Sequence, residues 1–357
     1  MLKKSATDCA HEGGHVMPAE NQPTKKISID EVAKALGVSK TTVSRALSGK
    51  GRISEATRGR VRDYIAQAGA EPAVRAQPAA RETHNLTMVI PSDFVHLDLP
   101  FLRKCMGGIC TAAAQRGYDL LLCYVSGADT SQLERQLDCH KMDGVILSRT
   151  IQNDPCVELL RRHKMPFVAI GRTEDPAIPQ VDNDQAAASQ EMTRLLLQLG
   201  LRRIALLTGS PSYYVNQDRA KGYFDALAEL GIQPDPALVR TGIESDAQRI
   251  DALDAVLERR PDCILCGDDR LAFDVSLELQ ARRIRVPDYI RLASLYDSEL
   301  TAGLNPAISA VHFDAVALGG AACRMLLDLM AGKAAARPLV MGHQVVLRDS
   351  TKSLPRR

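Results

Sequence analysis

Several signals that mark common classes of protein are absent from this chain of 357 residues. It has no run of about eighteen apolar residues and no signal peptide, which argues against a membrane-spanning or secreted protein. No G-x-G-x-x-G motif follows a predicted strand and no P-loop occurs, so the usual nucleotide-binding signals are missing. No Ser-His-Asp or paired-carboxylate arrangement indicates a catalytic site. We therefore expect a cytoplasmic protein that is not an enzyme.

The nine cysteines do not suggest a disulfide framework. Most lie in apolar runs, where cysteine behaves as a small buried hydrophobe. Cys263 and Cys266 form a C-x-x-C pair, but residues three apart on a strand point to opposite faces, so a packed core is the prediction. Near the N-terminus, Cys9, His11 and His15 are three ligand types, whereas a structural zinc site needs four. We expect neither a metal nor a cofactor.

The segment 27–47, ISIDEVAKALGVSKTTVSRAL, has the pattern of two short helices joined by a turn. Ser28 and Glu31 form an S-x-x-E capping box at the start of the first helix. Gly37 ends that helix, and Ser39 caps the second. Two short helices joined by a glycine-containing turn indicate a helix-turn-helix, whose second helix enters the major groove of DNA. The structural alternative is a helical hairpin with a solvated polar face.

The outer face of the second helix carries hydroxyl and cationic side chains, which suit contacts with bases and phosphates. We predict base contacts by Lys40, Thr41 and Arg45, and DNA-backbone contacts by Ser39, Thr42 and Ser44. Segment 25–69 contains ten basic and four acidic residues, which leaves six positive charges, whereas the whole chain carries +2. A basic segment on a mildly acidic body is typical of a nucleic-acid binder with a separate second task.

The motif GVSKTTVSRAL, followed by SGKGRISEATRGRV, resembles the headpiece of the LacI/GalR family of bacterial transcription regulators. The resemblance implies a third helix after Ser54. Its inward-facing residues are expected to be Val61, Tyr64, Ile65 and Ala68. The family also has a hinge helix whose leucine wedges into the minor groove. Here Ala79 occupies the leucine position and Pro78 interrupts the helix, so we expect that this chain does not kink its operator in the family manner.

Beyond the linker, apolar strands alternate with amphipathic helices. The expected strands span 86–91, 119–125, 143–148, 167–171, 203–209, 263–267 and 291–296. The expected helices span 101–116, 129–141, 154–164, 184–199, 216–230, 246–259, 270–282 and 314–331. Continuous apolar strands separated by helices are typical of parallel sheets covered on both faces. Seven such units are too many for one small sheet, and the break after Asn183 indicates two lobes.

This part resembles the family's core, a periplasmic-binding-protein type I fold of two Rossmann-like lobes between which the chain crosses three times. The matching pieces include Val181-Asp182-Asn183, Arg219-x-x-Gly222-Tyr223, Gly267-Asp268-Asp269, Tyr296-Asp297 and Gly319. The expected fold class is therefore multidomain, with an all-α helix-turn-helix headpiece and an α/β core. The expected parts are a disordered extension (1–24), headpiece (25–69), hinge or linker (70–84), core (85–352) and tail (353–357). Lobe one is expected at 85–182 plus 296–331, and lobe two at 183–295 plus 332–352.

The resemblance assigns effector contacts to Arg219 and Asp269, with Phe101 and Tyr296 at the cleft. An arginine donates to two oxygens and a carboxylate accepts from hydroxyls, which suits a polyol. The alternatives are a solvated arginine at a helix start for Arg219 and a helix N-cap for Asp269.

Two further arginines, Arg149 and Arg172, follow strands of lobe one. Together with Arg219 they would place three guanidinium groups around the cleft, which favours an effector with a carboxylate or phosphate. The alternative for Arg172 is an ion pair with its neighbours Glu174 or Asp175.

These features predict a sequence-specific transcriptional regulator, most simply a repressor whose operator binding is modulated by a sugar or sugar derivative. The expected partners are double-stranded operator DNA, the effector and a second copy of the chain, because paired recognition helices need matching half-sites. The C-terminus lacks leucine heptads, so a dimer is expected and not a tetramer. The alternatives are a corepressed regulator, an activator, a sugar-binding transport protein or an enzyme.

Overall fold

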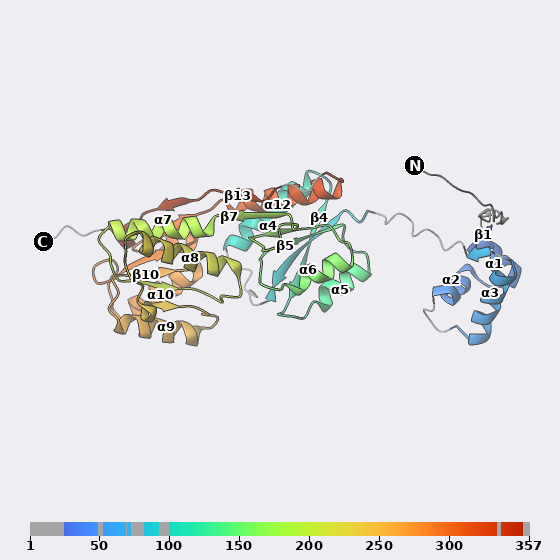
Figure 1. Cartoon of the computed structure of the whole chain (residues 1–357), viewed down its shortest axis with the longest axis horizontal. Helices are drawn as coiled ribbons and strands as arrows, with labels where there is room; N and C mark the ends of the chain where they lie inside the picture. Colours follow the sequence, from blue (N-terminus) through green and yellow to red (C-terminus); the bar gives the residue numbers. More distant parts are fainter. Residues whose placement is uncertain are drawn as a thin grey trace, which may run out of the picture. The chain divides into compact units, whose positions relative to one another are not determined.

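The computed structural model describes residues 25–48, 53–68, 70–72, 82–92, 100–333 and 337–352. The chain divides into two compact units, Met1–Arg81 and Glu82–Arg357 (Figure 1). Cys9, His11 and His15, the hinge positions Pro78 and Ala79, and the tail 353–357 lie outside the described residues. No helix within the described ranges is long and apolar enough to span a membrane.

The first unit contains the three helices expected from the sequence: α1 (Ile29–Leu36), α2 (Lys40–Ser48) and α3 (Glu55–Gln67). The capping box is formed, because the Ser28 N–H donates to Glu31 Oε2 at 2.8 Å and the Glu31 N–H donates to Ser28 Oγ at 3.2 Å. Gly37 ends α1 with φ +66°, a left-handed conformation that glycine adopts without strain. These local signals therefore place the turn between α1 and α2.

A small apolar core joins the three helices. Its buried members are Val32, Ala33, Val43, Ala46, Val61 and Ile65. Ala68, which was expected to pack inward, is exposed because it follows the last turn of α3 as its C-cap. A second difference concerns the linker. Strand β2 (Ala70–Pro72) pairs in parallel with β1 (Lys25–Ile27), so residues 70–72 belong to the first unit. Strands this short carry no periodic signal in the sequence.

The second unit contains all seven strands and all eight helices expected from the sequence, arranged in two lobes. Lobe one has a parallel sheet in the order β13-β7-β6-β5-β3-β4. Its strands are β3 (Asn85–Pro91), β4 (Asp119–Val125), β5 (Gly144–Leu147), β6 (Phe167–Ile170), β7 (Gln180–Asn183) and β13 (Leu339–Met341). Its helices are α4 (Pro100–Ala114), α5 (Ser131–Asp138), α6 (Pro155–Arg162) and α12 (Ala315–Met330). Helices α4 and α12 pack on one face of the sheet and α5 and α6 on the other.

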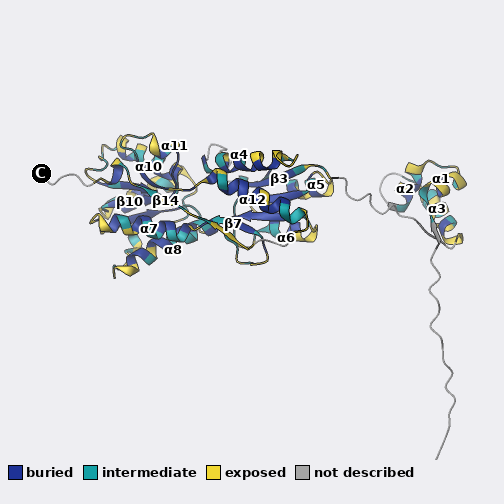
Figure 2. Cartoon of the chain, turned by 90° about the horizontal axis from the view of Figure 1, so that it is seen from above, coloured by how far each residue is buried: buried dark blue, intermediate teal, exposed yellow. Residues whose placement is uncertain are grey.

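Lobe two repeats this plan with the sheet order β14-β12-β11-β10-β8-β9, in which only β14 runs antiparallel. Its strands are β8 (Ile204–Leu207), β9 (Val239–Arg240), β10 (Cys263–Cys266), β11 (Arg291–Ser294), β12 (Ser309–His312) and β14 (Gln344–Val346). Its helices are α7 (Gln185–Gln198), α8 (Tyr214–Glu229), α9 (Asp246–Glu258), α10 (Asp269–Ala281) and α11 (Glu299–Ala302), with 3-10 turns at Pro236–Leu238 and Asp349–Thr351. Figure 2 shows the buried residues concentrated in the sheets and on the inner helix faces.

The two cysteines of β10 lie on opposite faces of the strand, as the sequence predicted. Cys263 packs with the cluster under α7 and α8, whereas Cys266 packs with the cluster under α9 and α10 on the opposite face. Both are free thiols in the buried core.

The expected lobe boundaries were wrong in two places. Strand β12, placed in lobe one from the sequence, pairs with β11 of lobe two. Strand β13, placed in lobe two, pairs with β7 of lobe one. The chain still crosses between lobes three times: after β7, between β12 and α12, and between β13 and β14. Apolar pattern does not specify which sheet a short edge strand joins, so these assignments required the structure.

Two glycines of the family-like motifs allow the helices beside the cleft to pack closely. A Cβ on Gly319 of α12 would lie 2.1 Å from the carbonyl oxygen of Cys105 in α4. A Cβ on Gly222 of α8 would lie 2.1 Å from the carbonyl oxygen of Ala186 in α7. The same contact between α7 and α8 lets the Ser189 hydroxyl donate to the Arg219 carbonyl at 2.6 Å. Close packing thus fixes the backbone that carries Arg219.

Candidate functional site

The first unit presents the polar face of α2. Lys40, Thr41, Ser44 and Arg45 are exposed. Ser39 has a structural task, because its Oγ accepts from the Thr42 N–H at 3.1 Å and its hydroxyl hydrogen-bonds with the Thr42 hydroxyl at 2.8 Å. The predicted DNA-contacting side chains therefore lie along one exposed helix, whose start is capped by two of them.

Charge on this face is partly paired. The Lys40 Nζ lies 2.7 Å from Asp30 Oδ2, and both side chains are largely exposed. An exposed pair of this kind contributes about 0–1 kcal/mol and exchanges readily with other partners. Lys40 thus keeps the freedom to contact a phosphate or a base.

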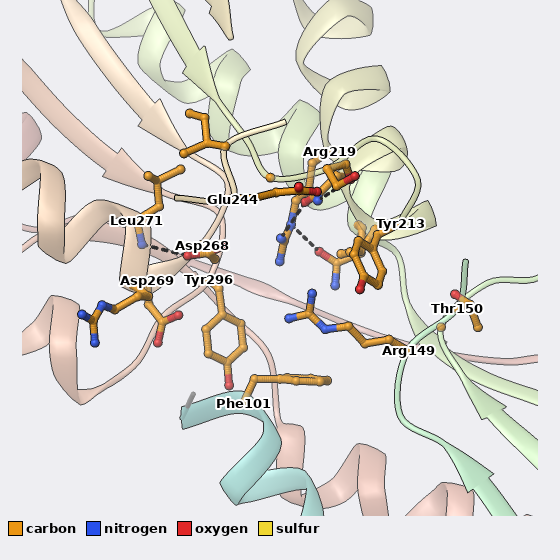
Figure 3. A pocket seen from close by; sticks show the side chains of 18 of the residues that line it. Phe101, Arg149, Thr150, Tyr213, Arg219, Glu244, Asp268, Asp269, Leu271 and Tyr296 are labelled. Atoms are coloured by element: carbon orange, nitrogen blue, oxygen red, sulfur yellow. Dashed lines mark hydrogen bonds between the residues drawn. The ribbon is translucent and has the colours of Figure 1, made fainter. Parts of the chain in front are cut away.

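The second unit contains a cavity of about 750 Å³ between the lobes. All six residues proposed from the sequence line it: Phe101, Arg149, Arg172, Arg219, Asp269 and Tyr296. Figure 3 shows Phe101, Arg149, Arg219, Asp269 and Tyr296 around the cavity. Most of the lining follows the carboxyl ends of strands, as with Arg149 after β5 and Asp268 after β10. Ligands of open α/β sheets bind at this edge, because the loops after parallel strands meet there.

Aromatic rings form one wall of the cavity. Phe101, in the first turn of α4 in lobe one, packs edge-on against Tyr296 of lobe two with ring centroids 5.7 Å apart. Tyr296 in turn stacks on Phe313 at 6.4 Å. The wall therefore offers apolar surface built from both lobes.

Asp269 is a buried carboxylate. The helix N-cap, which was the alternative role for Asp269, is its neighbour Asp268. The N-cap of α10 is Asp268, which accepts from the Leu271 N–H at 2.8 Å. Asp269 is only 3% exposed, and its Oδ2 has no hydrogen-bond partner in the described residues. Burial, followed by the charge of Asp268, raises the pKa of Asp269 to about 6, although a hydrogen bond with Ser298 opposes the shift.

Arg219 is a buried cation, 7% exposed, and not a solvated residue at a helix start. Its Nε donates to Gln185 Oε1 at 3.2 Å and its Nη1 to Asn216 Oδ1 at 3.5 Å. Burial is the main cause that lowers the pKa of Arg219 to about 10; Asp268 opposes the shift and Arg149 adds to it. The guanidinium therefore remains charged at neutral pH.

Arg172 lines the cavity but its charge is already paired. Its Nε and Nη2 donate to the two carboxylate oxygens of Asp218, each at 3.1 Å, and its guanidinium lies 4.5 Å from the Tyr214 ring centroid. The alternative, an ion pair with Glu174 or Asp175, is not the one formed, since Arg172 pairs with Asp218 and Asp175 pairs with Arg161. Asp218 lies on α8 of the other lobe, so no local sequence pattern reveals it.

Further contacts also join the lobes. The Tyr214 N–H donates to the Thr150 carbonyl and the Gln152 N–H donates to the Ser212 carbonyl, each at 3.3 Å. Lys104 of lobe one lies 3.0 Å from Glu299 of lobe two. The structure therefore describes a closed conformation, in which these contacts join the two lobes beside the cavity.

Several residues that line the cavity have buried polar side-chain atoms without a hydrogen-bond partner in the described residues. They are Ser148 Oγ, Asn183 Oδ1, Arg249 Nε and Nη1, Asp269 Oδ2 and Tyr296 OH. Buried polar groups in native proteins are rarely left unpaired, so such a group of atoms around one cavity indicates a polar ligand or ordered water.

Sequence reasoning missed some of these residues as site residues. Ser148 and Asn183 carried a usable signal, because each lies where an apolar strand ends. Arg249 carried none, since it lies within α9, and only the packing of α9 brings it to the cavity.

A helix-turn-helix unit joined to a two-lobed core with a polar cavity defines a DNA-binding protein with a second site for a small molecule. Comparison with known proteins agrees. Residues 28–72 match the bacterial regulatory proteins of the lacI family, and residues 193–351 match the periplasmic binding protein-like domain.

The HTH-type transcriptional regulator AglR of Rhizobium meliloti is 31% identical over 253 residues, which are 69% of this chain and 71% of that protein. The regulator CelR of Thermobifida fusca is 27% identical over 335 residues, 91% of this chain and 98% of that protein. A solved CelR–cellobiose complex covers 92% of this chain and 100% of its own, with a TM-score of 0.69 and 27% identity. This chain belongs to the LacI family of bacterial transcription regulators.

Proposed function

We propose that this regulator is a repressor whose operator binding is weakened by a sugar or sugar derivative in the core cavity. The observation that carries the proposal is the group of buried polar atoms around the cavity that lack a partner among the described residues, in a chain whose other unit presents the exposed polar face of α2. The relative solved with cellobiose supports a carbohydrate as the ligand class. Because operator DNA lies in the bacterial cytoplasm, the protein acts there.

The proposal assigns base contacts to Lys40, Thr41 and Arg45, and backbone contacts to Ser39, Thr42 and Ser44. A homodimer places two such helices on matching half-sites. The effector acts through lobe geometry, and the proposal includes that the protein releases its ligand unchanged.

The test is fluorescence anisotropy of the purified full chain with DNA fragments from around its own gene, at one fixed salt concentration. We expect specific binding that is lost in Arg45→Ala and weakened by a sugar. The matched control is Arg62→Ala, which removes the same charge from an exposed position on α3. Equal losses of DNA affinity in both variants would show a general charge effect and contradict the assigned base contact of Arg45.

A corepressed regulator is the second candidate, and the same titration separates it, because a corepressor strengthens operator binding. Sedimentation of the complex measures the number of chains bound per operator, for which we expect two. Chemical conversion of a bound sugar by the purified protein would contradict the assignment as a non-enzyme.

A further inference from the structure

Two guanidinium groups enter the cavity from opposite lobes. Arg149 follows β5 of lobe one, and Arg219 comes from α8 of lobe two. In Figure 3 both groups point into the same part of the cavity. They are close enough to repel, since the charge of Arg149 contributes to the lowered pKa of Arg219, after burial as the main cause.

Three cationic side chains of the cavity have carboxylate partners, and the guanidinium of Arg149 lies 5.5 Å from the centroid of the Tyr213 ring. Arg172 pairs with Asp218 at 3.1 Å, Arg249 with Asp246 at 3.2 Å, and Arg270 with Asp274 at 3.0 Å. Arg219 differs, because its hydrogen bonds go to the neutral amides of Gln185 and Asn216. Within the described part of the chain, no ion pair of 4.0 Å or less involves Arg219.

Among the described residues, neither Asp268 nor Asp269 forms an ion pair with Arg219. Asp268 favours both guanidinium charges from a distance, but its carboxylate caps α10 through the Leu271 N–H. In Figure 3 the Asp269 carboxylate lies beyond the Tyr296 ring from Arg149. The cavity therefore has a cationic part at Arg149 and Arg219 and an acceptor part at Asp269.

We propose that the effector carries an anionic oxygen group, a carboxylate or a phosphate, which binds between Arg149 and Arg219, while its hydroxyl groups bind Asp269 and Tyr296. The proposal rests on the proposed function, because it assumes that the cavity binds the effector. Two buried like charges repel, and a bound anion converts that repulsion into two charge-assisted hydrogen-bonded contacts. The unpaired Asp269 Oδ2 and Tyr296 OH then receive the hydroxyl groups of the same ligand.

The test compares matched ligands by isothermal titration of the full chain. The pairs are glucose with gluconate, glucuronate and glucose 6-phosphate, and cellobiose with cellobionate. We expect an acidic member to bind at least about thirtyfold more tightly than its neutral counterpart, the effect of one desolvated charge contact. The member that binds shows whether the anionic group is a carboxylate or a phosphate.

Variants connect the preference to Arg149. Arg149→Met is expected to reduce affinity for the acidic ligand about thirtyfold and leave a neutral sugar unaffected. Arg149→Lys keeps the charge and should keep most of the preference, which separates loss of charge from loss of folding. Arg270→Met is the control, because Arg270 lines the same cavity but pairs with Asp274.

A neutral sugar that binds as tightly as its acid and releases DNA would overturn the anionic ligand while leaving the proposed function intact. Binding by no member of any pair would also overturn it. Operator binding measured on the same preparation then shows whether the regulator function fails as well.

Discussion

The ion pair between Arg172 and Asp218 is expected to hold the two lobes closed. Asp218→Asn removes the charge without changing the size of the side chain. The pair is bidentate, which strengthens it, but Arg172 is 39% exposed and Asp218 16%, so solvent screening reduces its contribution. We estimate that the pair stabilises the closed state by about 1 kcal/mol, or about fivefold in the equilibrium between closed and open lobes.

Hydrogen exchange measures this opening directly. The Tyr214 and Gln152 amides donate across the lobes, so they exchange when the lobes separate. In Asp218→Asn we expect both amides to exchange about fivefold faster. The Arg202 and Arg203 amides, which donate to Asp262 within lobe two, should be unchanged.

Two further variants test the cause. Asp225→Asn breaks an ion pair with Lys221 on the same helix that does not cross the lobes, so it should leave both bridging amides unchanged. In a double-mutant cycle, Arg172→Gln should add little to Asp218→Asn, because each removes the same contact. Additive effects, or no faster exchange in Asp218→Asn, would refute the role of this pair in closure.

Three other predictions follow from local contacts. Ser28→Ala removes the cap of α1 and should destabilise that helix by about 1 kcal/mol, seen as faster exchange of its amides; unchanged exchange would contradict this. Gly222→Ala places a methyl group against the Ala186 carbonyl and should lower the free energy of unfolding of the core by about 1–3 kcal/mol in urea titrations. Because the pKa of Asp269 is raised to about 6, the ionisation of this one carboxyl lowers the stability of the folded core as the pH rises from about 4 through 6. Asp269→Asn should remove this contribution and raise the urea midpoint at pH 7, whereas the contribution of Asp182, whose pKa is raised by burial to about 7, should remain. An unchanged pH profile would show that Asp269 ionises freely.

Local elements of this protein are determined by its sequence. Ser28, Glu31 and Gly37 specify the start and end of α1, because caps depend on residues within one or two helical turns. The periodicity of apolar residues identified the parallel strands and helices of the core, and it placed Cys263 and Cys266 on opposite faces of β10. Polar residues at the ends of apolar strands identified much of the cavity, because loops after parallel strands converge at one edge.

Only the tertiary structure decided the contacts between distant segments. The partner of Arg172 lies 46 residues away in the other lobe. The sequence pointed instead to Glu174 and Asp175, which are close to Arg172 along the chain. The short strands β12 and β13 join the lobes opposite to those expected, because three or four residues carry too little pattern to select a sheet. Among the described residues, Arg219 has no ion pair, and Asp269 and Tyr296 have polar atoms without a partner; both features also depend on how the lobes close. These long-range arrangements determine what the cavity can bind, since burial and the choice of partner set the charge and the free hydrogen-bonding capacity of each side chain.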